Sequence, residues 1–359
     1  MVSATVIRVE ILVAHHFMNI IKILRNNIAR LIYLLKLSKP ERLGRGHLSI
    51  ATFHRILPES ERQSYPFPGL VVTPEELESY LKYFIEHFDC GPLAIQHERY
   101  LRGGIPARPL LAITFDDAQF DNYSNARPVL DRYKVRATFF VPVVAVQKQE
   151  LLWHDRLGFA ALFLLNQPDD GQDRLIKILA DFGIHVAGTG NLIGKAVQAS
   201  KLLSLEARLR LVASLTEASG QDPAPEYARL MTFEEIAELA ADGHEIGSHS
   251  MTHCMMPECD DSALIYEIAE SRKVLQARVG QSIDSFCYPN GNSDLRTAQA
   301  VERAGYHRAV TTAWGSNGVE ADRFQFRRYD MVAKHVQDSN GKLIPSLLAL
   351  RMSGFYPGL

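Results

Sequence analysis

The sequence predicts an α/β fold in which short buried strands alternate with helices and pair into a parallel sheet that is closed or nearly closed. Residues 109–115 are a continuous apolar run, Pro-Leu-Leu-Ala-Ile-Thr-Phe, which is typical of a strand buried on both faces. Residues 73–76 read Thr-Pro-Glu-Glu, a helix capping box with proline at the first helical position, and an apolar-periodic segment follows it. Repeated strand and helix units of this length imply parallel strands.

The other elements follow in order along the chain. We expect strands at residues 48–53, 109–115, 136–141, 243–248, 285–288 and 309–312. We expect helices over residues 73–88, at 129–134 and after a second capping box at 232–235. Residues 151–228 interrupt this rhythm with a mostly helical segment, which we interpret as an insertion that forms a lid or one wall of the cleft.

The bulk composition fits an enzyme with one large core. The chain has 359 residues, of which 47% are hydrophobic and 22% are charged. An α/β barrel alone uses about 200 to 250 residues, so one catalytic domain with additions is the simplest organisation. The net charge of -2 provides no general basic field, so we expect no nucleic-acid partner. The four cysteines form no Cys-x-x-Cys pair and are too few for a disulfide framework, which indicates a reducing compartment.

The first 45 residues form a basic amphipathic extension. They carry eight lysines and arginines against two glutamates, interspersed with leucine and isoleucine. No apolar run reaches the roughly 18 residues that a spanning helix needs, and the stretch does not resemble a signal peptide. Two interpretations stay open: a helix that lies on an anionic membrane surface, and a helix that packs on the domain with its charged side in water. We expect a cytoplasmic protein, peripheral to the inner face of the membrane if the first interpretation holds.

Two motifs carry the chemistry, and each follows an expected strand. Asp116 and Asp117 come directly after the apolar run, and His249 and His253 come after the strand at 243–248. The carboxyl ends of strands are where α/β barrels and open α/β sheets place their sites. One carboxylate and two imidazoles leave a metal with an open position for water, and the spare aspartate can accept a proton from that water. The pattern therefore favours metal-assisted hydrolysis, although it does not say which aspartate has which role.

Each motif also has a simpler interpretation when it is taken alone. Paired aspartates are common at helix N-termini, where a carboxylate caps free backbone N–H groups. Two histidines four residues apart often form part of a polar helix surface. The position of both motifs just past strand ends is what favours the functional interpretation.

Together these segments resemble the polysaccharide deacetylases with a NodB-homology domain, also called carbohydrate esterase family 4. Residues 114–117 (Thr-Phe-Asp-Asp) look like the first motif of that family, residues 249–253 (His-Ser-Met-Thr-His) like its second, and residues 288–291 (Tyr-Pro-Asn-Gly) like part of its third. The flanking strands are similar as well, and the resemblance covers residues 48–335. It implies a distorted (β/α) barrel of NodB-homology type with fewer than eight strands, together with removal of acyl groups from N-acylated sugars.

Carried over residue by residue, the resemblance assigns roles within the motifs. Asp116 would be the general base, and Asp117, His249 and His253 would bind a divalent metal, zinc in the first place, with cobalt or nickel as alternatives. The backbone N–H of Asn290 would help to hold the oxyanion, in a rigid Pro-x-Gly turn. That turn could equally be an ordinary strand-ending turn if it were seen alone.

The sequence departs from the family pattern at two places. Where the family has an arginine that orients the catalytic aspartate, this chain has Cys287, so we expect Arg328 to take over that role, although Arg328 could instead pair with surface acids. The late Leu-x-His motif that supplies the general acid is missing. His54 ends the first strand and is our candidate for that role, with a buried structural histidine as the alternative.

The expected function follows from these assignments. We expect a metal-dependent hydrolase that removes the N-acetyl group from a sugar of a surface polysaccharide, a lipopolysaccharide or a lipid-linked precursor. A deformylase or another amidase of the same fold, and a non-catalytic carbohydrate-binding relative, are the alternatives. The expected organisation is a basic extension over residues 1–45, a catalytic domain over 46–340 with its insertion at 151–228, and a C-terminal tail over 341–359.

Overall fold

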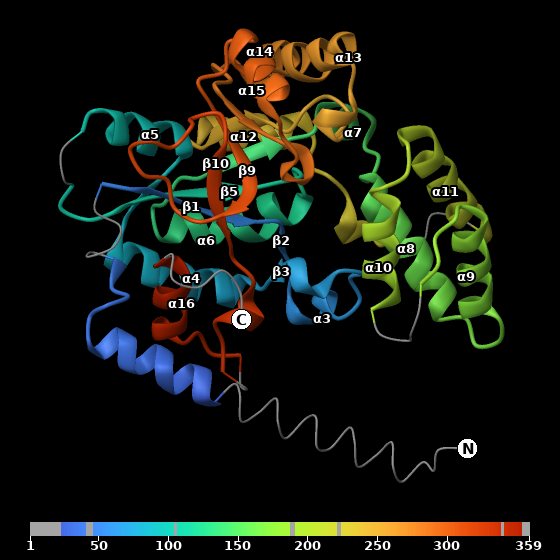
Figure 1. The fold of residues 1–359 in the computed structure, drawn as a ribbon, viewed down its shortest axis with the longest axis horizontal. Helices are drawn as coiled ribbons and strands as arrows, with labels where there is room; N and C mark the ends of the chain where they lie inside the picture. The colour runs from blue at the N-terminus through green and yellow to red at the C-terminus, as the bar shows by residue number, and fades with distance from the viewer. Residues whose placement is uncertain are drawn as a thin grey trace.

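The structure is a computed structural model that describes residues 23–40, 46–103, 106–186, 191–220, 224–338 and 341–353. Within these residues, seven parallel strands close into a barrel (Figure 1). In spatial order they are β1 (Leu48–Phe53), β10 (Phe326–Asp330), β9 (Arg308–Trp314), β8 (Ser285–Cys287), β7 (Glu245–Ser248), β6 (Thr138–Val141) and β5 (Leu110–Phe115). The pairing of β5 with β1 closes the barrel. The expected closed parallel sheet with fewer than eight barrel strands is confirmed.

The closing pair is the most regular part of the barrel. Strands β1 and β5 run in register over six residues, from Leu48 opposite Leu110 to Phe53 opposite Phe115, and both are buried throughout. Strand β4 (Asp89–Gly91) pairs with the start of β5 as an additional edge strand, and β2 (Arg55–Ile56) and β3 (Val71–Val72) form a small second sheet. The sequence did not predict these three strands, because two or three residues are too few to show an alternation.

Alternate side chains of the barrel strands point to opposite faces. Phe53 and Ile113 pack in a large cluster with residues of the surrounding helices. Leu48 and Leu110 instead pack with residues of β6, β8, β9 and β10, so this second cluster fills the barrel interior. Thr114 continues the inward alternation toward the carboxyl end of β5, where the interior becomes polar. The next inward position after Thr114 is Asp116.

Helices surround the barrel (Figure 1). Helices α4 (Pro74–His87) and α12 (Phe233–Ala241) begin with the predicted capping boxes, because the Thr73 and Thr232 side chains accept from backbone N–H groups three residues on. Both capping boxes are therefore confirmed. The other helices of this layer are α3 (Glu59–Arg62), α5 (Leu93–Leu101), α6 (Arg127–Arg132), α7 (Val143–Lys148), α13 (Asp261–Ile265), α14 (Ser271–Val279) and α15 (Leu295–Arg303).

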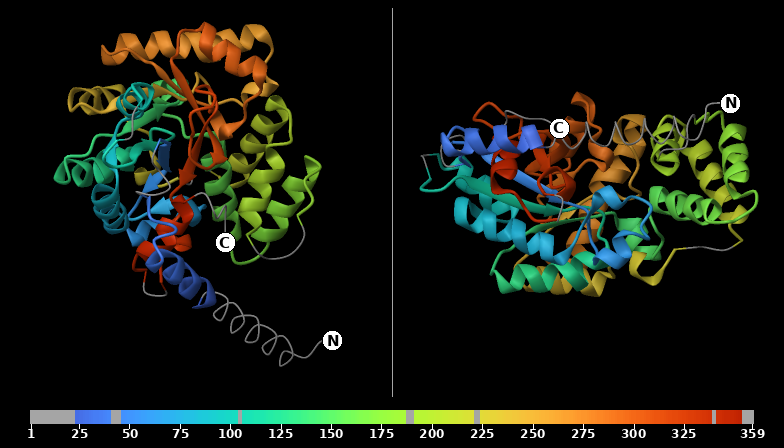
Figure 2. Two further views of the ribbon diagram at one scale, coloured as in Figure 1. Left: turned by 60° about the vertical axis from the view of Figure 1, so that its left-hand side comes forward. Right: turned by 90° about the horizontal axis from the view of Figure 1, so that it is seen from below.

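The segment that interrupts the strand and helix rhythm forms a helical lobe beside the barrel (Figure 2). It contains α8 (Trp153–Leu165), α9 (Gly171–Asp181), α10 (Leu192–Ser200) and α11 (Leu205–Ala218). These helices bury an apolar cluster of their own, which includes Leu157, Leu164 and Leu211 and is distinct from the barrel core. The lobe is therefore a self-packed unit that stands on one side of the barrel.

Two terminal segments pack on the barrel. Residues 23–34 are helical, and Ala29 is fully buried in the outer core of the barrel. Helix α16 (Pro345–Met352) buries Leu348 and Ala349 in the same core, so the packed unit extends beyond residue 340, the boundary expected from the sequence. The rest of the expected extension and tail, residues 1–22, 41–45 and 354–359, lies outside the described residues. None of the described helices combines the length and hydrophobicity needed to cross a membrane.

Candidate active site

The backbone is strained in the loops that carry the three motifs. Asp116 still belongs to the sheet, because its N–H donates to Phe53 O at 3.0 Å, but Asp117 turns away with a φ of 72°. A positive φ is costly for residues other than glycine, and such residues concentrate at functional sites. The structure describes nine residues other than glycine with a positive φ. Five of them lie in the motif loops: Asp117, Ala118, Ser250, His253 and Asn290.

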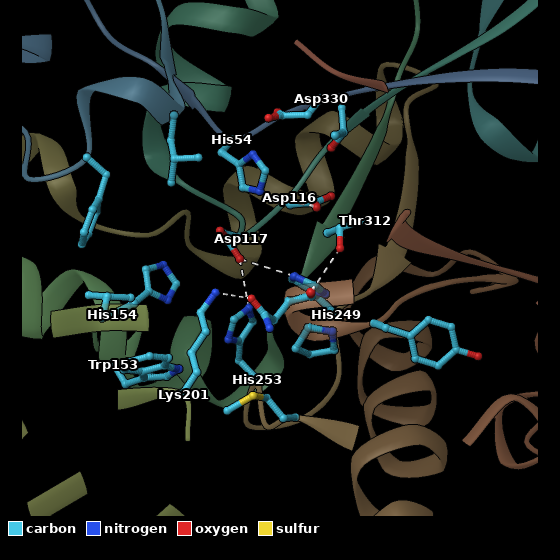
Figure 3. Close-up of a pocket in the computed structure, with 18 of the residues that line it drawn as sticks. His54, Asp116, Asp117, Trp153, His154, Lys201, His249, His253, Thr312 and Asp330 are labelled. Carbon is cyan, nitrogen blue, oxygen red and sulfur yellow. Dashed lines mark hydrogen bonds and ion pairs between the residues drawn. The ribbon is translucent and has the colours of Figure 1, made fainter. Parts of the chain in front are cut away.

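Asp117, His249 and His253 point at one another (Figure 3). Asp117 Oδ1 lies 3.4 Å from Nε2 of His249 and 3.2 Å from Nε2 of His253, and all three side chains are buried. His249 Nδ1 lies 2.8 Å from the carbonyl oxygen of Cys287. Because a carbonyl oxygen can only accept, Nδ1 donates a proton to it, and this leaves Nε2 as the ring nitrogen that faces Asp117.

The two histidines lie on an irregular loop and not on a helix. The loop is held by its own hydrogen bonds: His253 N–H donates to Ser250 Oγ at 2.9 Å. The carboxylate of Glu267 accepts from the backbone N–H of Thr252 at 2.8 Å and from its hydroxyl at 2.5 Å. These bonds stabilise the loop conformation that turns both imidazoles to the same point.

This three-residue group has the donors that a divalent metal needs. Its two imidazole nitrogens and one carboxylate oxygen lie within 4.8 Å of one another, and Asp117 Oδ1 has no hydrogen-bond partner among the described residues. Burial opposes ionisation of Asp117, but its contacts with the histidines outweigh burial and hold its pKa well below the usual range. Burial lowers the pKa of His253 to about 4, so this imidazole is neutral and has a free lone pair. One carboxylate with imidazoles fits zinc, which keeps a position open when the protein supplies three ligands.

His249 shows that the group attracts positive charge. Burial lowers its pKa, but its contacts with Cys287 and Asp117 outweigh burial and raise the pKa well above the usual range. A protein without metal would therefore hold a proton here. A bound cation would supply the same positive charge in place of that proton.

Asp116 lies beside this group and is paired with an arginine from β10, which is separated from β5 by the single strand β1. Arg328 Nη1 donates to Asp116 Oδ1 at 2.8 Å and Nη2 donates to Oδ2 at 2.7 Å, a bidentate ion pair in which both side chains are buried. Arg328 also donates to Thr52 Oγ1 and to the carbonyl oxygen of Thr311. Burial raises the pKa of Asp116, but Arg328 outweighs it and lowers the pKa below its usual range. Asp116 is therefore ionised at neutral pH.

Cys287 occupies the position at which the family resemblance led us to expect an arginine, and the guanidinium of Arg328 lies next to it. Cys287 Sγ lies 3.3 Å from Arg328 Nη2 and 3.7 Å from Asp116 Oδ2. Burial raises the pKa of the Cys287 thiol, so the residue is a neutral neighbour of the ion pair. The guanidinium is thus supplied by β10 and not by β8.

The remaining sequence candidates, His54 and Asn290, line the same cavity. His54 Nε2 lies 3.9 Å from Asp116 Oδ2, and its side chain is 22% exposed, so it can reach a ligand. Asn290 sits in a turn with a φ of 57°. The turn packs closely on β9, because a Cβ at Gly291 would lie 2.0 Å from Thr312 Oγ1.

Sequence reasoning missed the residues that the insertion contributes. The cavity has a volume of about 480 Å³, and Trp153, His154 and Lys201 from the insertion line it together with the motif residues (Figure 3). The ring centroids of His154 and His253 are 5.7 Å apart. Trp153, His154 and Asp155 form a polar and aromatic cluster at the start of an apolar helix, and that cluster was the signal that could have identified them.

The sequence matches the pattern of a known protein family. The family described as polysaccharide deacetylase matches residues 104–309, more than half of the chain and all three motifs. YxkH of Bacillus subtilis strain 168, whose name describes it provisionally as a polysaccharide deacetylase, is 21% identical over 223 residues. That match covers 62% of this chain and 52% of YxkH, so the chain spans about half the length of this relative.

Solved structures share the fold at low sequence identity. The deacetylase PplD of Streptococcus pyogenes, solved in complex with acetate, has 16% identity and a TM-score of 0.57, and the match covers 85% of this chain and 98% of that one. BC0361, a polysaccharide deacetylase from Bacillus cereus, has 16% identity and a TM-score of 0.50, and the match covers 80% of this chain and 65% of that one. At these identities the similarity shows the fold, a NodB-type (β/α) barrel.

Proposed function

Since the chain belongs to the polysaccharide deacetylase family, we propose that it is a metal-dependent hydrolase that removes the N-acetyl group from an N-acetylated sugar. The observation that supports this most is the position of an ionised, arginine-paired Asp116 next to the group formed by Asp117, His249 and His253. A carboxylate that stays ionised while buried is suited to accept a proton, and the neighbouring group is suited to hold a cation.

The proposed mechanism divides the work among these side chains. A divalent metal held by Asp117, His249 and His253 would supply a Lewis acid that lowers the pKa of water and polarises the acyl carbonyl. Asp116 accepts the proton of the attacking water. Its Oδ2 accepts from both Arg328 and the Cys287 thiol, whereas among the described residues its Oδ1 accepts only from Arg328 and keeps a free lone pair for the proton.

The other two candidates act on the acyl oxygen and the leaving amine. The turn at Asn290 lies at the cavity wall, where its backbone N–H can donate to the developing oxyanion. His54 is close enough to Asp116 to share a proton relay through one water, and it would protonate the amine as it leaves. In this mechanism Asp116 takes the proton from the water, and His54 gives a proton to the leaving amine.

Acetyl is the acyl group that the comparisons support best. PplD, a deacetylase, was solved with acetate, which is the acid that N-deacetylation releases. We propose that the sugar is part of a surface polysaccharide, a lipopolysaccharide or a lipid-linked precursor. The description of the family supports a polysaccharide substrate. The exposed surface of the helix at residues 23–34 is the reason to include substrates that are attached to a membrane.

That helix exposes an apolar face, and we propose that it rests on the inner face of the cytoplasmic membrane. Leu24, Ile28 and Leu31 on the helix and Leu35 directly after it recur at intervals of four, three and four residues, and each is 47–59% exposed. Residues 23–40 contain four lysines and arginines and no acidic residue, so a lipid surface with negative charge is the matching partner.

The experiment that tests the proposed function identifies the product. Zinc-loaded protein is incubated with N-acetylated oligosaccharides, and acetate and free amines are both measured. We expect equal amounts of the two. Formate release from a formylated sugar, without acetate release, would instead indicate a deformylase. Sugar binding without release of either acid would indicate a non-catalytic relative.

A further inference from the structure

The insertion is tied to the loops that carry the motifs. Asp155 on α8 is fully buried and accepts from Gln119 Nε2, in the loop after β5, at 3.1 Å. Arg208 on α11 forms an ion pair with Glu258, with 3.4 Å between Nη2 and Oε2. Glu258 follows His249 and His253 in the segment after β7. The insertion is therefore held at a fixed position over the cavity, and its residues there are part of the wall.

Lys201 makes the third connection, to the loop after β8. It follows α10, and its Nζ donates to the side-chain oxygen of Asn290. Arg208 fixes this end of the helix by donating to the carbonyl oxygens of Ser200 at 3.1 Å and of Lys201 at 3.3 Å. The ammonium group is thus presented to the cavity by a backbone that is itself held in place.

Lys201 is a cation without an anion. Its hydrogen-bond acceptor is uncharged, and none of the described carboxylates forms an ion pair with it. Burial and the nearby Arg208 both lower the pKa of Lys201, which is the direction expected for a positive charge that has lost water and gained no counter-charge. An anion placed beside Nζ would stabilise the positive charge and raise the pKa of Lys201 again.

The charges around the cavity are divided between its two walls. The carboxylates that line it, Asp116, Asp117 and Asp330, all come from the barrel. On the insertion side the titratable groups are His154 and Lys201, and no acidic side chain of the described insertion lines the cavity. The insertion wall therefore carries the positive charge that is not already compensated.

We propose that Lys201 anchors a subsite that binds an anionic group of the substrate, a phosphate or a carboxylate, next to the N-acyl sugar. A cavity of about 480 Å³ can hold a sugar with one substituent. Trp153 packs edge-to-face on His154, with 5.7 Å between the ring centroids, and adds an aromatic surface to the same wall. This inference rests on the proposed function, because it places the charged group relative to the sugar that is deacetylated.

Two kinds of substrate carry such a group. A sugar joined to a lipid or a nucleotide has a phosphate on its anomeric oxygen, whereas a polysaccharide repeat can have a uronic acid carboxylate beside the N-acetylated sugar. Both present anionic oxygens to an ammonium donor. The experiment therefore includes one ligand of each kind.

Full-length protein is titrated by calorimetry in the Asp116→Asn background, in which most of the turnover is expected to be lost. The ligands are N-acetylglucosamine 1-phosphate, a disaccharide of N-acetylglucosamine and glucuronic acid, and the uncharged methyl glycoside of N-acetylglucosamine. We expect one of the anionic sugars to bind about tenfold or more tightly than the methyl glycoside, the range of a hydrogen bond to a charged group. Lys201→Ala and Lys201→Glu should remove that preference, and Lys201→Arg should keep it.

Lys177→Ala is the matched control, because Lys177 is an exposed lysine of the same insertion that does not line the cavity. The anionic sugar that binds more tightly identifies the source of the anion. A wild-type protein without the preference, a preference that persists in Lys201→Ala, or failure of all three sugars to bind overturns the proposal. Acetate release from an uncharged oligosaccharide by the wild-type protein decides the proposed function separately.

Discussion

Arg328 and Asp116, which are 212 positions apart in the sequence, form a bidentate ion pair inside the carboxyl end of the barrel. The pair spans the interior from β10 to the loop after β5, and Thr52, Thr114 and Thr311 complete the hydrogen bonds of the guanidinium. Both partners are buried, so neither charge is compensated by water. The arginine therefore determines whether Asp116 can remain ionised.

Arg328→Ala should move the acidic limb of the kcat/KM profile to higher pH. Burial alone raises the pKa of Asp116, and Arg328 is the main group that lowers it. A general base works only when it is ionised, so a higher pKa means that activity is lost at a higher pH as the solution is acidified. Arg328→Lys keeps the positive charge but loses the bidentate hydrogen bonding of the guanidinium. Its pH profile should therefore lie between those of the wild type and Arg328→Ala.

Arg327→Ala is the control, because this exposed arginine is on the same strand. Removing one partner of a buried pair costs about 3–5 kcal/mol of stability, so each variant is first checked for a folding transition. Cys287→Arg should restore part of the activity to Arg328→Ala, because Cys287 lies beside the guanidinium. A folded Arg328→Ala enzyme with the wild-type pH profile would contradict the role proposed for this arginine.

Asp116→Asn should keep the metal and lose most of the turnover. The amide preserves the shape of the side chain but cannot accept a proton, and a general base contributes about 10²–10⁴-fold. Asp117→Asn should have the opposite primary effect, which is loss of metal. Metal content by mass spectrometry of the native protein, together with acetate release, checks both. If Asp116→Asn stays active and Asp117→Asn keeps its metal, the two roles are wrongly assigned.

Leu24→Gln combined with Leu31→Gln should weaken binding to anionic vesicles. The two side chains lie on the apolar face of the helix at residues 23–34 and are 59% and 58% exposed. Co-sedimentation with vesicles that contain an anionic lipid measures the effect, and wild-type binding should fall as salt is raised. Ile265→Gln with Leu295→Gln, an exposed pair outside this segment, is the control. Equal binding by both double variants would exclude this face as the contact.

Local sequence patterns were sufficient where a single element carried the information. The run that ends at Phe115 identified β5, and the capping box at Thr73 identified the start of α4. Because parallel strands bring their carboxyl ends to one edge, the strand ends also indicated that Asp117 and His249 would lie close together, and in the structure their side chains are 3.4 Å apart.

Other features depend on contacts between distant segments. The position of the insertion depends on Asp155, which bonds to Tyr65 at 2.6 Å and to Gln119 at 3.1 Å, and no periodicity in the insertion indicates those partners. For the same reason Lys201 could not be assigned to the cavity. Strand β10 was not among the strands read from the pattern, because Phe326–Asp330 contains two arginines and an aspartate in five residues. The barrel accepts Arg328 there only because Asp116 balances its charge.

In the proposed function, Asp117, His249 and His253 hold the metal on which acetate release depends. The most direct test loads metal-free wild-type, His249→Ala and His253→Ala proteins with increasing Zn²⁺ and measures bound metal and acetate release on the same samples. In the wild type we expect both to saturate at one metal per chain. Each histidine variant should lose metal affinity by more than the tenfold to hundredfold typical of changes outside the ligand set, and should lose acetate release with it. Acetate release that is complete without metal, or histidine variants with wild-type metal content, would contradict this assignment of the metal ligands.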